Sequence, residues 1–338
     1  MKKIIFVSLL LAVFALAFSM AMSVSKPIDA DTGSASSASP AVSASPGSTA
    51  TDAQVTVRVK TGETVVTMTM SQYLVGVVAA EMPAVFNLEA LKAQTVAART
   101  ETLYHMNHVS GTHPDADICT DPSDCQAYQD DAALRQKWGD AYSDYIKKIT
   151  DAVSATDGVC LTYDNTPIQA VFHSSSAGKT AASGEVWTAS LPYLVSVTSP
   201  ESSADVPNYV SSVTVTLADF KETVLKYYPE AVFGKDSATW VSDITYTESG
   251  RVGTVKLGGV SVTGPVLRNM FGLRSTAASI KLDDKNVVFT TTGYGHGVGM
   301  SQYGANAFAQ EGKTYREILS WYYTGVTFSD ELAFVKKT

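Results

Sequence analysis

One carboxylate stands out in this sequence because it lies where an apolar, helix-like segment meets a proline. The segment VVAAEMPAVFNLEALKAQTVAART, residues 77–100, carries Glu81 directly before a Met-Pro dipeptide and continues into a second helix-like run with Lys92 and Arg99. A proline disfavours helical geometry in the residue before it, so we expect the first helix to end near Met82 with Glu81 in its last turn. Such a glutamate could act as a general acid, or it could form a salt bridge with a cation such as Arg99.

A second candidate site is the glycine-rich segment GYGHGVGMSQYGANAF, residues 293–308. Its alternating glycines allow positive φ angles and a close approach of a ligand to backbone amides. A helix beginning at Ser301 and Gln302 would direct free N–H groups at an anionic or hydroxyl-rich ligand. The alternative is a glycine-rich turn with His296 hydrogen-bonded within it, and the residues alone favour neither interpretation.

The segment HSSSAGKTAASGEVW, residues 173–187, is polar and built from small residues. Its Ala-Gly-Lys-Thr run imitates a phosphate loop, but His173 stands where that motif needs a glycine. We interpret the segment as a hydroxyl-lined sugar subsite, although a solvated loop is the simpler interpretation of any single serine. Together with PYLVSVTSP and the glycine-rich segment it supplies the candidate substrate-binding residues, which are His173, Ser174, Ser175, Ser176, Lys179, Tyr193, Tyr294, His296, Ser301 and Gln302.

A third cluster contains possible metal ligands. His113, Cys119 and Cys125 are spaced by six and six residues in HPDADICTDPSDCQAY, which places three soft or borderline ligands in one short loop and indicates a zinc site. The alternative is a Cys119–Cys125 disulfide, favoured by an oxidising compartment, with Cys160 as a small buried hydrophobic residue.

The elements that must position these residues are of mixed type. Alternating runs in residues 55–70 predict a β-hairpin, and Ser71 and Asn87 are expected to cap the two helices around Glu81. Ser301 and Thr314 are expected to cap two closing helices. Further helices are predicted at 131–155 and 218–228, and strands at 159–164, 168–176, 193–199, 210–218, 252–264 and 286–293. Without a regular βαβ alternation, the pattern indicates an α+β body. We expect this body to carry a central substrate cleft.

Composition limits the functional classes. The 338 residues are 45% hydrophobic and 17% charged, which is enough to bury a large core. The net charge of -8 argues against a nucleic-acid partner, because such proteins need a basic face to displace counterions from phosphates.

The N-terminus carries an export segment. Two lysines precede an apolar run from Ile4 to Val24, long enough to cross a bilayer as a helix. We expect residues 1–24 to be a retained anchor with a cytoplasmic N-terminus, and a cleaved signal peptide is the alternative. Residues 25–53 have the composition of a flexible linker, so we expect residues 54–338 to form the extracytoplasmic catalytic domain.

Four segments in the same order carry a resemblance to a known family. YLVGVVAAEMPAVFNLEALKAQTVAART, HSSSAGKT, PYLVSVTSP and GYGHGVGMSQYGANAFAQEGKTYREILSWYYTGV resemble the stage II sporulation protein D family, which shares its domain with amidase-enhancer proteins. The resemblance covers residues 73–326. The chain departs from the family pattern in residues 173–187, which we call the serine loop, because Ala177 precedes Gly178 where two glycines are usual.

The resemblance implies a peptidoglycan lytic transglycosylase in which Glu81 is the catalytic acid and Lys92 and Arg99 belong to the cleft. The glycosidic bond between N-acetylmuramic acid and N-acetylglucosamine would be cleaved by the C6 hydroxyl of muramic acid, giving 1,6-anhydro ends. We assign Lys92 and Arg99 to orienting the lactyl or N-acetyl groups of the substrate. One carboxylate suffices for this reaction, whereas ordinary glycosidases need two.

The resemblance also implies the cofactor, partners and location. Some members bind zinc through a histidine and two cysteines, and in this chain Asp124 stands where a second histidine often precedes the last cysteine, which leaves the fourth ligand open. The expected metal is structural zinc. The expected substrates are glycan strands stripped of stem peptides, and the expected partner is a membrane-anchored amidase and endopeptidase at the sporulation septum during engulfment.

Two other functions compete with this one. The chain could be a non-catalytic enhancer that holds glycan or a partner amidase, but a pure binding protein has no need of an acid at an apolar helix end. A zinc hydrolase is the weaker alternative, because catalytic zinc needs an open coordination position with a general base nearby, and none is evident beside Cys125.

Overall fold

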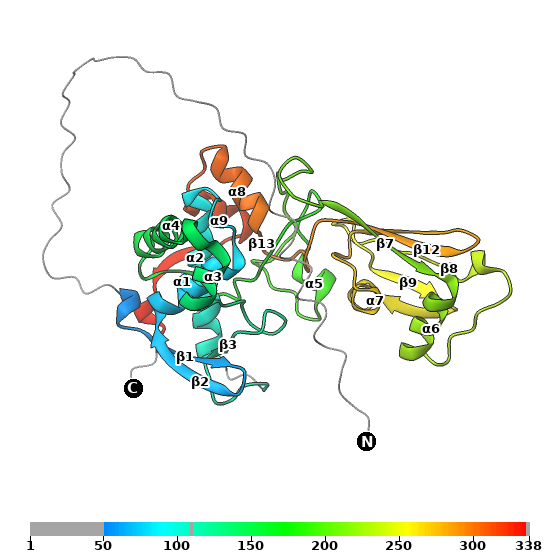
Figure 1. Ribbon diagram of the computed structural model, residues 1–338, viewed down its shortest axis with the longest axis horizontal. Coiled ribbons are helices and arrows are strands. Elements are labelled where there is room, and N and C mark those ends of the chain that lie inside the picture. The colour runs from blue at the N-terminus through cyan, green and yellow to red at the C-terminus, as the bar shows by residue number, and fades with distance from the viewer. Residues whose placement is uncertain (1–50, 109–110, 336–338) are drawn as a thin grey trace, which may run out of the picture. The chain divides into compact units, whose positions relative to one another are not determined.

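The computed structural model describes residues 51–108 and 111–335 as a mixture of helices and small sheets, which confirms the α+β class (Figure 1). The expected membrane segment, residues 1–24, lies outside the described residues, as does nearly all of the expected linker. In the part of the chain that is described, no helix is both long and apolar enough to span a membrane.

The helices and strands occur in mixed order along the chain. The α-helices are α1 Met70–Glu81, α2 Leu88–Asn107, α3 Asp131–Trp138, α4 Tyr142–Ala155, α5 Ser183–Val186, α6 Leu217–Tyr227, α7 Gly264–Phe271, α8 Gln302–Gln310 and α9 Tyr315–Tyr322. The strands are β1 Thr56–Thr61, β2 Thr64–Thr69, β3 Ile118–Cys119, β4 Val159–Tyr163, β5 Thr166–Pro167, β6 Phe172–His173, β7 Val210–Thr216, β8 Val241–Ser242, β9 Thr254–Leu257, β10 Val260–Thr263, β11 Ala278–Leu282, β12 Asn286–Thr292, β13 Met300–Ser301 and β14 Thr327–Asp330.

The described strands form several small sheets. Their strand orders are β2-β1-β3, β10-β9-β8, β11-β12-β7, β13-β6 and β14-β4-β5. The predicted hairpin is confirmed as the antiparallel pair β1–β2. The parallel pair β13–β6 places Ser301 opposite His173, so it joins the end of the glycine-rich segment to the serine loop.

The helix ends predicted on either side of Glu81 are largely confirmed. Helix α1 ends at Glu81, and Met82 takes an extended conformation (φ -116°, ψ 143°), as expected for a residue before proline. Asn87 caps α2 by accepting a hydrogen bond from the Glu89 N–H. The expected cap at Ser71 is wrong, because Thr69 caps α1 through a reciprocal capping box with Gln72.

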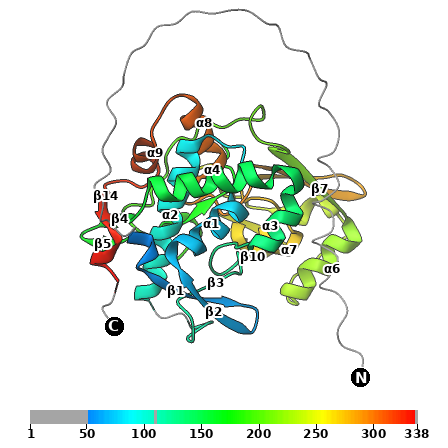
Figure 2. The same cartoon turned by 60° about the vertical axis from the view of Figure 1, so that its left-hand side comes forward.

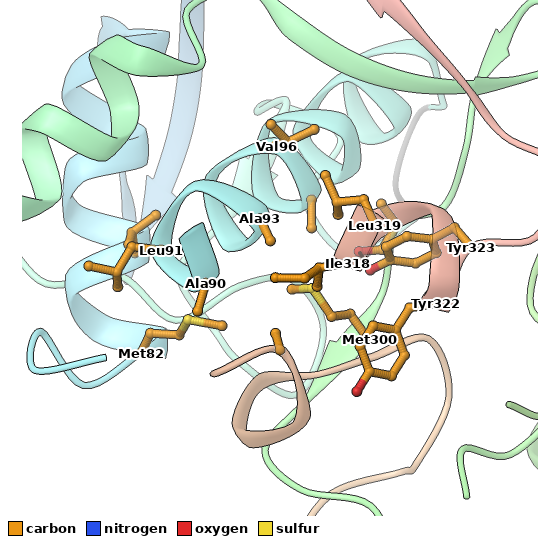
Figure 3. Packing of buried hydrophobic residues seen from close by; sticks show 14 of the residues in the cluster. Met82, Ala90, Leu91, Ala93, Val96, Met300, Ile318, Leu319, Tyr322 and Tyr323 are labelled. Carbon is orange, nitrogen blue, oxygen red and sulfur yellow. Dashed lines mark hydrogen bonds between the residues drawn. The ribbon is translucent and has the colours of Figure 1, made fainter. Parts of the chain in front are cut away.

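Helices α2 and α9 form the centre of the first core. Small side chains on α2, including Ala90 and Ala93, face Ile318 and Leu319 of α9, with Met300 filling the space beside them (Figure 3). Because these alanines have short side chains, the larger residues of α9 lie close to the α2 backbone and are fully buried. Burial of each large aliphatic side chain contributes about 1.5–3 kcal/mol.

Residues 217–289 have a separate hydrophobic core. It gathers apolar side chains from α6, α7, β9, β10, β11 and β12, with Phe220 stacked on Phe271 at its centre. The first core includes Leu194, with Val197 packed against it, and its next residue along the chain is Val298, so the chain leaves that core after Val197 and returns to it near Val298. The serine loop and the glycine-rich segment therefore flank an inserted unit, seen in Figure 1 around β7, β9 and β12.

Some element predictions are wrong. The helix expected at 131–155 is interrupted, because Gly139 adopts a positive φ of 51° and separates α3 from α4. Of the strands expected at 168–176 and 193–199, the structure contains only Phe172–His173. The backbone of these segments instead bonds to other loops, as in the 2.8 Å hydrogen bond from the Thr180 N–H to the Val197 carbonyl.

Candidate active site

Glu81 is held at the end of α1 by two hydrogen bonds. The backbone N–H of Ala127 donates to Oε1 at 2.8 Å, and the side-chain amide of Gln302 donates to Oε2 at 3.2 Å. Gln302 is the first residue of α8, while Ala127 follows Cys125 by two residues. Three segments far apart in sequence therefore meet at this carboxyl group.

The surroundings of Glu81 favour its protonated form. Burial raises the pKa of Glu81 and outweighs the opposing effect of the hydrogen bonds from Ala127 and Gln302, which stabilise the carboxylate. Among the described residues, no lysine, arginine or second carboxylate contributes to this shift. Glu81 thus has the electrostatics of a general acid.

The glycine-rich segment adopts the backbone geometry that its sequence predicts. Gly293, Gly295, Gly297 and Gly299 all have positive φ angles, between 70° and 109°. The close approach, however, is made by the protein itself, because a Cβ on Gly299 would lie 2.0 Å from the Val171 carbonyl oxygen. The segment is packed against the serine loop.

The expected ligand site at the N-terminus of α8 is occupied by the protein's own groups. The Ser301 hydroxyl accepts from the Gly304 N–H, as predicted for a cap, and the Tyr303 N–H donates to the Ser174 carbonyl. These N–H groups are not available to a ligand. The helix instead positions the Gln302 side chain toward Glu81.

The two histidines of the loops are neutral and structural. His173 must donate from Nδ1 to the Val298 carbonyl, so its Nε2 accepts from the Ser176 hydroxyl at 2.7 Å. His296 accepts from the Val298 N–H at Nδ1 and donates from Nε2 to the Phe172 carbonyl. Burial lowers the pKa of His173 well below its usual value and that of His296 to about 4. Neither is a candidate for the acid.

A buried carboxylate that the sequence reasoning missed joins the loops. Glu201, 3% exposed, accepts from the Ser176 N–H at 2.6 Å and from the Ser301 hydroxyl at 2.5 Å. Its other oxygen accepts from Ser199, which also contacts the Tyr322 hydroxyl. Ser176 and Ser301 are therefore part of the scaffold. No local pattern around Glu201 indicated this role, because its partners come from distant segments.

The assignment of Arg99 to the cleft is wrong. Arg99 is fully buried and binds Asp52 through two hydrogen bonds, from Nε at 2.7 Å and from Nη2 at 2.6 Å. Its Nη1 donates to the Val159 carbonyl, and its Nε lies 3.8 Å from Glu331. The alternative of a salt bridge to Glu81 is wrong as well. Asp52 belongs to the short 3-10 helix Thr51–Ala53, within the segment expected to be linker.

Lys92 also does not contact Glu81. Its ammonium group forms a 2.7 Å ion pair with Glu89, one turn earlier on α2. Glu89 in turn accepts from the Tyr315 N–H at the start of α9. The pair thus fastens α9 to the first turn of α2, which is a structural role.

The remaining candidates differ in accessibility. Ser175 is buried and pairs through its backbone with Tyr294, whereas the ring of Tyr294 is 38% exposed. Ser174 is partly exposed and Lys179 is exposed. Tyr193 is 7% exposed, and its hydroxyl accepts from the Gln169 N–H. Of this group, Ser174, Lys179 and Tyr294 reach solvent.

The predicted metal ligands come together. One ligand atom from each of His113, Cys119, Asp124 and Cys125 lies within 4.8 Å of all the others. In tetrahedral zinc sites the donor atoms lie about 4 Å apart, so two thiols, an imidazole and a carboxylate at this spacing fit a metal ion. Asp124, which sequence reasoning took as a departure, supplies the fourth group. The three cysteines are free thiols rather than a disulfide.

Comparison with known proteins finds one matching family model and several similar proteins. Residues 59–163 match the family model described as stage II sporulation protein. The chain is 40% identical over 270 residues to stage II sporulation protein D of Bacillus subtilis (strain 168), covering 79% of this chain and 76% of that protein. It is 38% identical to the protein of the same name from Bacillus amyloliquefaciens, with the same coverage. An amidase enhancer of Bacillus subtilis (strain 168) is 31% identical over 303 residues, 76% of this chain and 40% of that protein.

Proposed function

Since this chain belongs to the stage II sporulation protein D family, we propose that it acts in sporulation as a peptidoglycan lytic transglycosylase with Glu81 as its acid and base. The observation that carries the proposal is the environment of Glu81. A partly buried carboxyl group with a raised pKa, held from two sides and with no contribution from another carboxylate of residues 51–108 and 111–335, suits a reaction that needs one proton carrier.

The hydrogen bonds indicate which oxygen carries the proton. The Ala127 N–H donates to Oε1 at 2.8 Å, whereas the Gln302 amide donates to Oε2 over the longer distance of 3.2 Å, so we assign the proton of the acid form to Oε2, the more weakly bonded oxygen. From there the proton passes to the glycosidic oxygen as the bond from C1 of muramic acid breaks. The C6 hydroxyl of the same sugar then attacks C1 and returns its proton to Glu81. The enzyme is regenerated, and the product carries a 1,6-anhydro ring.

We assign zinc to His113, Cys119, Asp124 and Cys125. Two thiolates, an imidazole and a carboxylate would fill a tetrahedral shell and leave no open position, so the ion would stabilise the loop rather than react. The same loop carries Ala127, two residues after Cys125. A firmly held loop would keep the Ala127 N–H directed at Glu81.

A non-catalytic function is the second candidate, because an amidase enhancer is similar to 76% of this chain. One experiment separates the two. The protein from residue 48 onward is incubated with purified glycan strands, and the products are weighed by mass spectrometry. Anhydro fragments, each one water lighter than a hydrolytic fragment, support the transglycosylase. Intact strands, together with faster release of stem peptides by an amidase added to peptide-bearing peptidoglycan, support the enhancer.

The location and partners follow from the same proposal. We place the catalytic body outside the cytoplasm at the sporulation septum, anchored by residues 1–24 and beside a membrane-anchored amidase and endopeptidase. Replacing residues 1–24 with a cleavable signal should release the protein from the membrane fraction. Its persistence there would indicate retention by a partner instead.

A further inference from the structure

Two arginines, Arg268 and Arg274, lie close to an exposed tyrosine at the start of the glycine-rich segment, and one of them stacks on its ring. The guanidinium of Arg274 lies over the ring of Tyr294, 4.2 Å from its centroid. Arg268, on α7, donates from Nε to the carbonyl of Leu273, the residue before Arg274, at 3.2 Å. Because the Tyr294 side chain is 38% exposed, this group of three side chains reaches the surface of the protein.

Neither arginine has an acidic partner. Among the described residues, no carboxylate oxygen lies within 4.0 Å of a nitrogen of Arg268 or Arg274. Arg251, buried beneath Gly297, differs from them because Glu185 and Glu201 lie near enough to favour its charge. In a chain with a net charge of -8, these two guanidinium groups are free to pair with an anion from outside the protein.

Arg274 interacts with Tyr303, the residue after the glutamine that binds Glu81. The positive charge of Arg274 acts on the hydroxyl of Tyr303 and lowers its pKa, although burial raises that pKa more strongly. Tyr303 follows Gln302, whose amide donates to Glu81. The Arg274 carbonyl also accepts from the Gly295 N–H at 2.9 Å, which fixes the arginine's backbone to the glycine-rich segment.

We propose that Arg268 and Arg274 form an anion subsite for the lactyl carboxylate of a muramic acid residue next to the bond that Glu81 protonates. The inference rests on the proposed function. A muramic acid without a stem peptide ends in a free carboxylate, whereas a stem peptide converts this group to a neutral amide. Guanidinium groups bind carboxylates in a planar, bidentate geometry, so the subsite selects strands stripped of peptide. It performs the task that the sequence assigned to Lys92 and Arg99.

The test compares two substrates that differ only in this charge. One set of stripped glycan strands keeps its lactyl carboxylates, and the other has them converted to N-methylamides. The variants are Arg268→Gln and Arg274→Gln. Arg316→Gln is the matched control, because this guanidinium also lies over an aromatic ring, 4.5 Å from the centroid of Phe328. For each protein, kcat/KM is measured on both substrates at low salt.

The unaltered protein and Arg316→Gln should cleave the carboxylate strands about ten- to a hundredfold faster than the methylamide strands, the range expected for hydrogen bonds to a charged group. Arg268→Gln and Arg274→Gln should lose most of this preference and keep their rate on methylamide strands. Equal losses on both substrates, or an unaltered protein without preference, would overturn the subsite.

Absence of cleavage would count against the proposed function, and it can be told apart from absence of the subsite. If the folded, unaltered protein cleaves neither substrate, equilibrium binding of the two strand types still tests the subsite. Tighter binding of carboxylate strands, lost in Arg274→Gln, would support the anion subsite without catalysis. Equal binding of both strand types would reject it.

Discussion

Glu81 and Gln302 lie 221 positions apart in the sequence, yet the Gln302 amide donates a 3.2 Å hydrogen bond to the Glu81 carboxylate. The bond joins the end of α1 to the start of α8, two helices that both pack against α2 (Figure 2). It favours the ionised form of Glu81, while burial favours the protonated form and dominates. The balance of the two effects sets the pH range in which Glu81 can act as an acid.

Replacing Glu81 with glutamine tests the acid directly. The substitution keeps the size of the side chain but removes the transferable proton, so Glu81→Gln should bind glycan strands nearly as well and cleave them on the order of 10²- to 10⁴-fold more slowly. Binding and product formation are measured on the same preparation. Full activity of Glu81→Gln would show that Glu81 is not the catalytic acid.

The pH dependence should reveal the raised pKa of Glu81. Because the acid must be protonated, kcat/KM should fall as pH rises, with the midpoint of this alkaline limb above 4.5, the ordinary value for glutamic acid. In Gln302→Met the carboxylate loses a donor, its pKa rises further, and the limb moves to higher pH. Gln310→Met, on the exposed end of the same helix, is the control. If the midpoint of the alkaline limb does not move in Gln302→Met, Gln302 does not affect the pKa of Glu81.

The buried Asp52–Arg99 ion pair predicts how far the N-terminus can be truncated before the folded protein loses stability. Both side chains are almost fully buried, so a protein that starts at Gln54 removes both hydrogen bonds from Arg99 to Asp52 and leaves only the more distant Glu331, 3.8 Å away, as a counter-charge. Such a protein should be less stable than one that starts at Ser48 by about 3–5 kcal/mol. Urea unfolding measures the difference. The exposed pair Lys147–Asp151 is the control, since Lys147→Ala should cost under about 1 kcal/mol.

Metal analysis tests the cluster at His113. Protein purified without chelator should contain about one zinc per chain, and Cys119→Ser and Cys125→Ser should lose it. Cys160→Ser, which removes a buried thiol of β4 outside the cluster, should keep it. Chelation should lower the melting temperature. An intact mass lower by two hydrogens, without bound metal, would instead identify a Cys119–Cys125 disulfide.

Glu331 should make stability depend on pH. Burial and the nearby Asp52 raise its pKa to about 9, although Arg99 opposes the shift. The unfolded chain loses this proton near 4.5, so between these values the folded state binds more protons and its stability falls as pH rises. In Glu331→Gln the free energy of unfolding should vary less between pH 5 and 9 than in the unaltered protein. An unchanged slope would show that Glu331 ionises normally in the folded state.

The sequence by itself determined the features that depend on near neighbours. Proline after Met82 ended α1 at Glu81, and Asn87, Ser301 and Thr314 capped helices where their side chains reach the first free N–H groups. Three of the four possible metal ligands, His113, Cys119 and Cys125, were also recognisable, because they lie in one short segment.

Only the tertiary structure decided which groups meet across the chain. Helical spacing placed Lys92 and Arg99 on one face of α2 but could not show that the two positions meet different surroundings. Arg99 lies in the protein interior, where desolvation makes an unpaired charge costly, and its counter-charge comes from Asp52, 47 residues earlier. The hydrogen bond to Glu81 from the Ala127 N–H comes from the backbone, which any residue except proline could supply, so the sequence does not reveal it. Arg274 contacts Tyr294 because the inserted unit returns the chain beside the serine loop. Such contacts depend on the packing of whole elements, which no local pattern encodes.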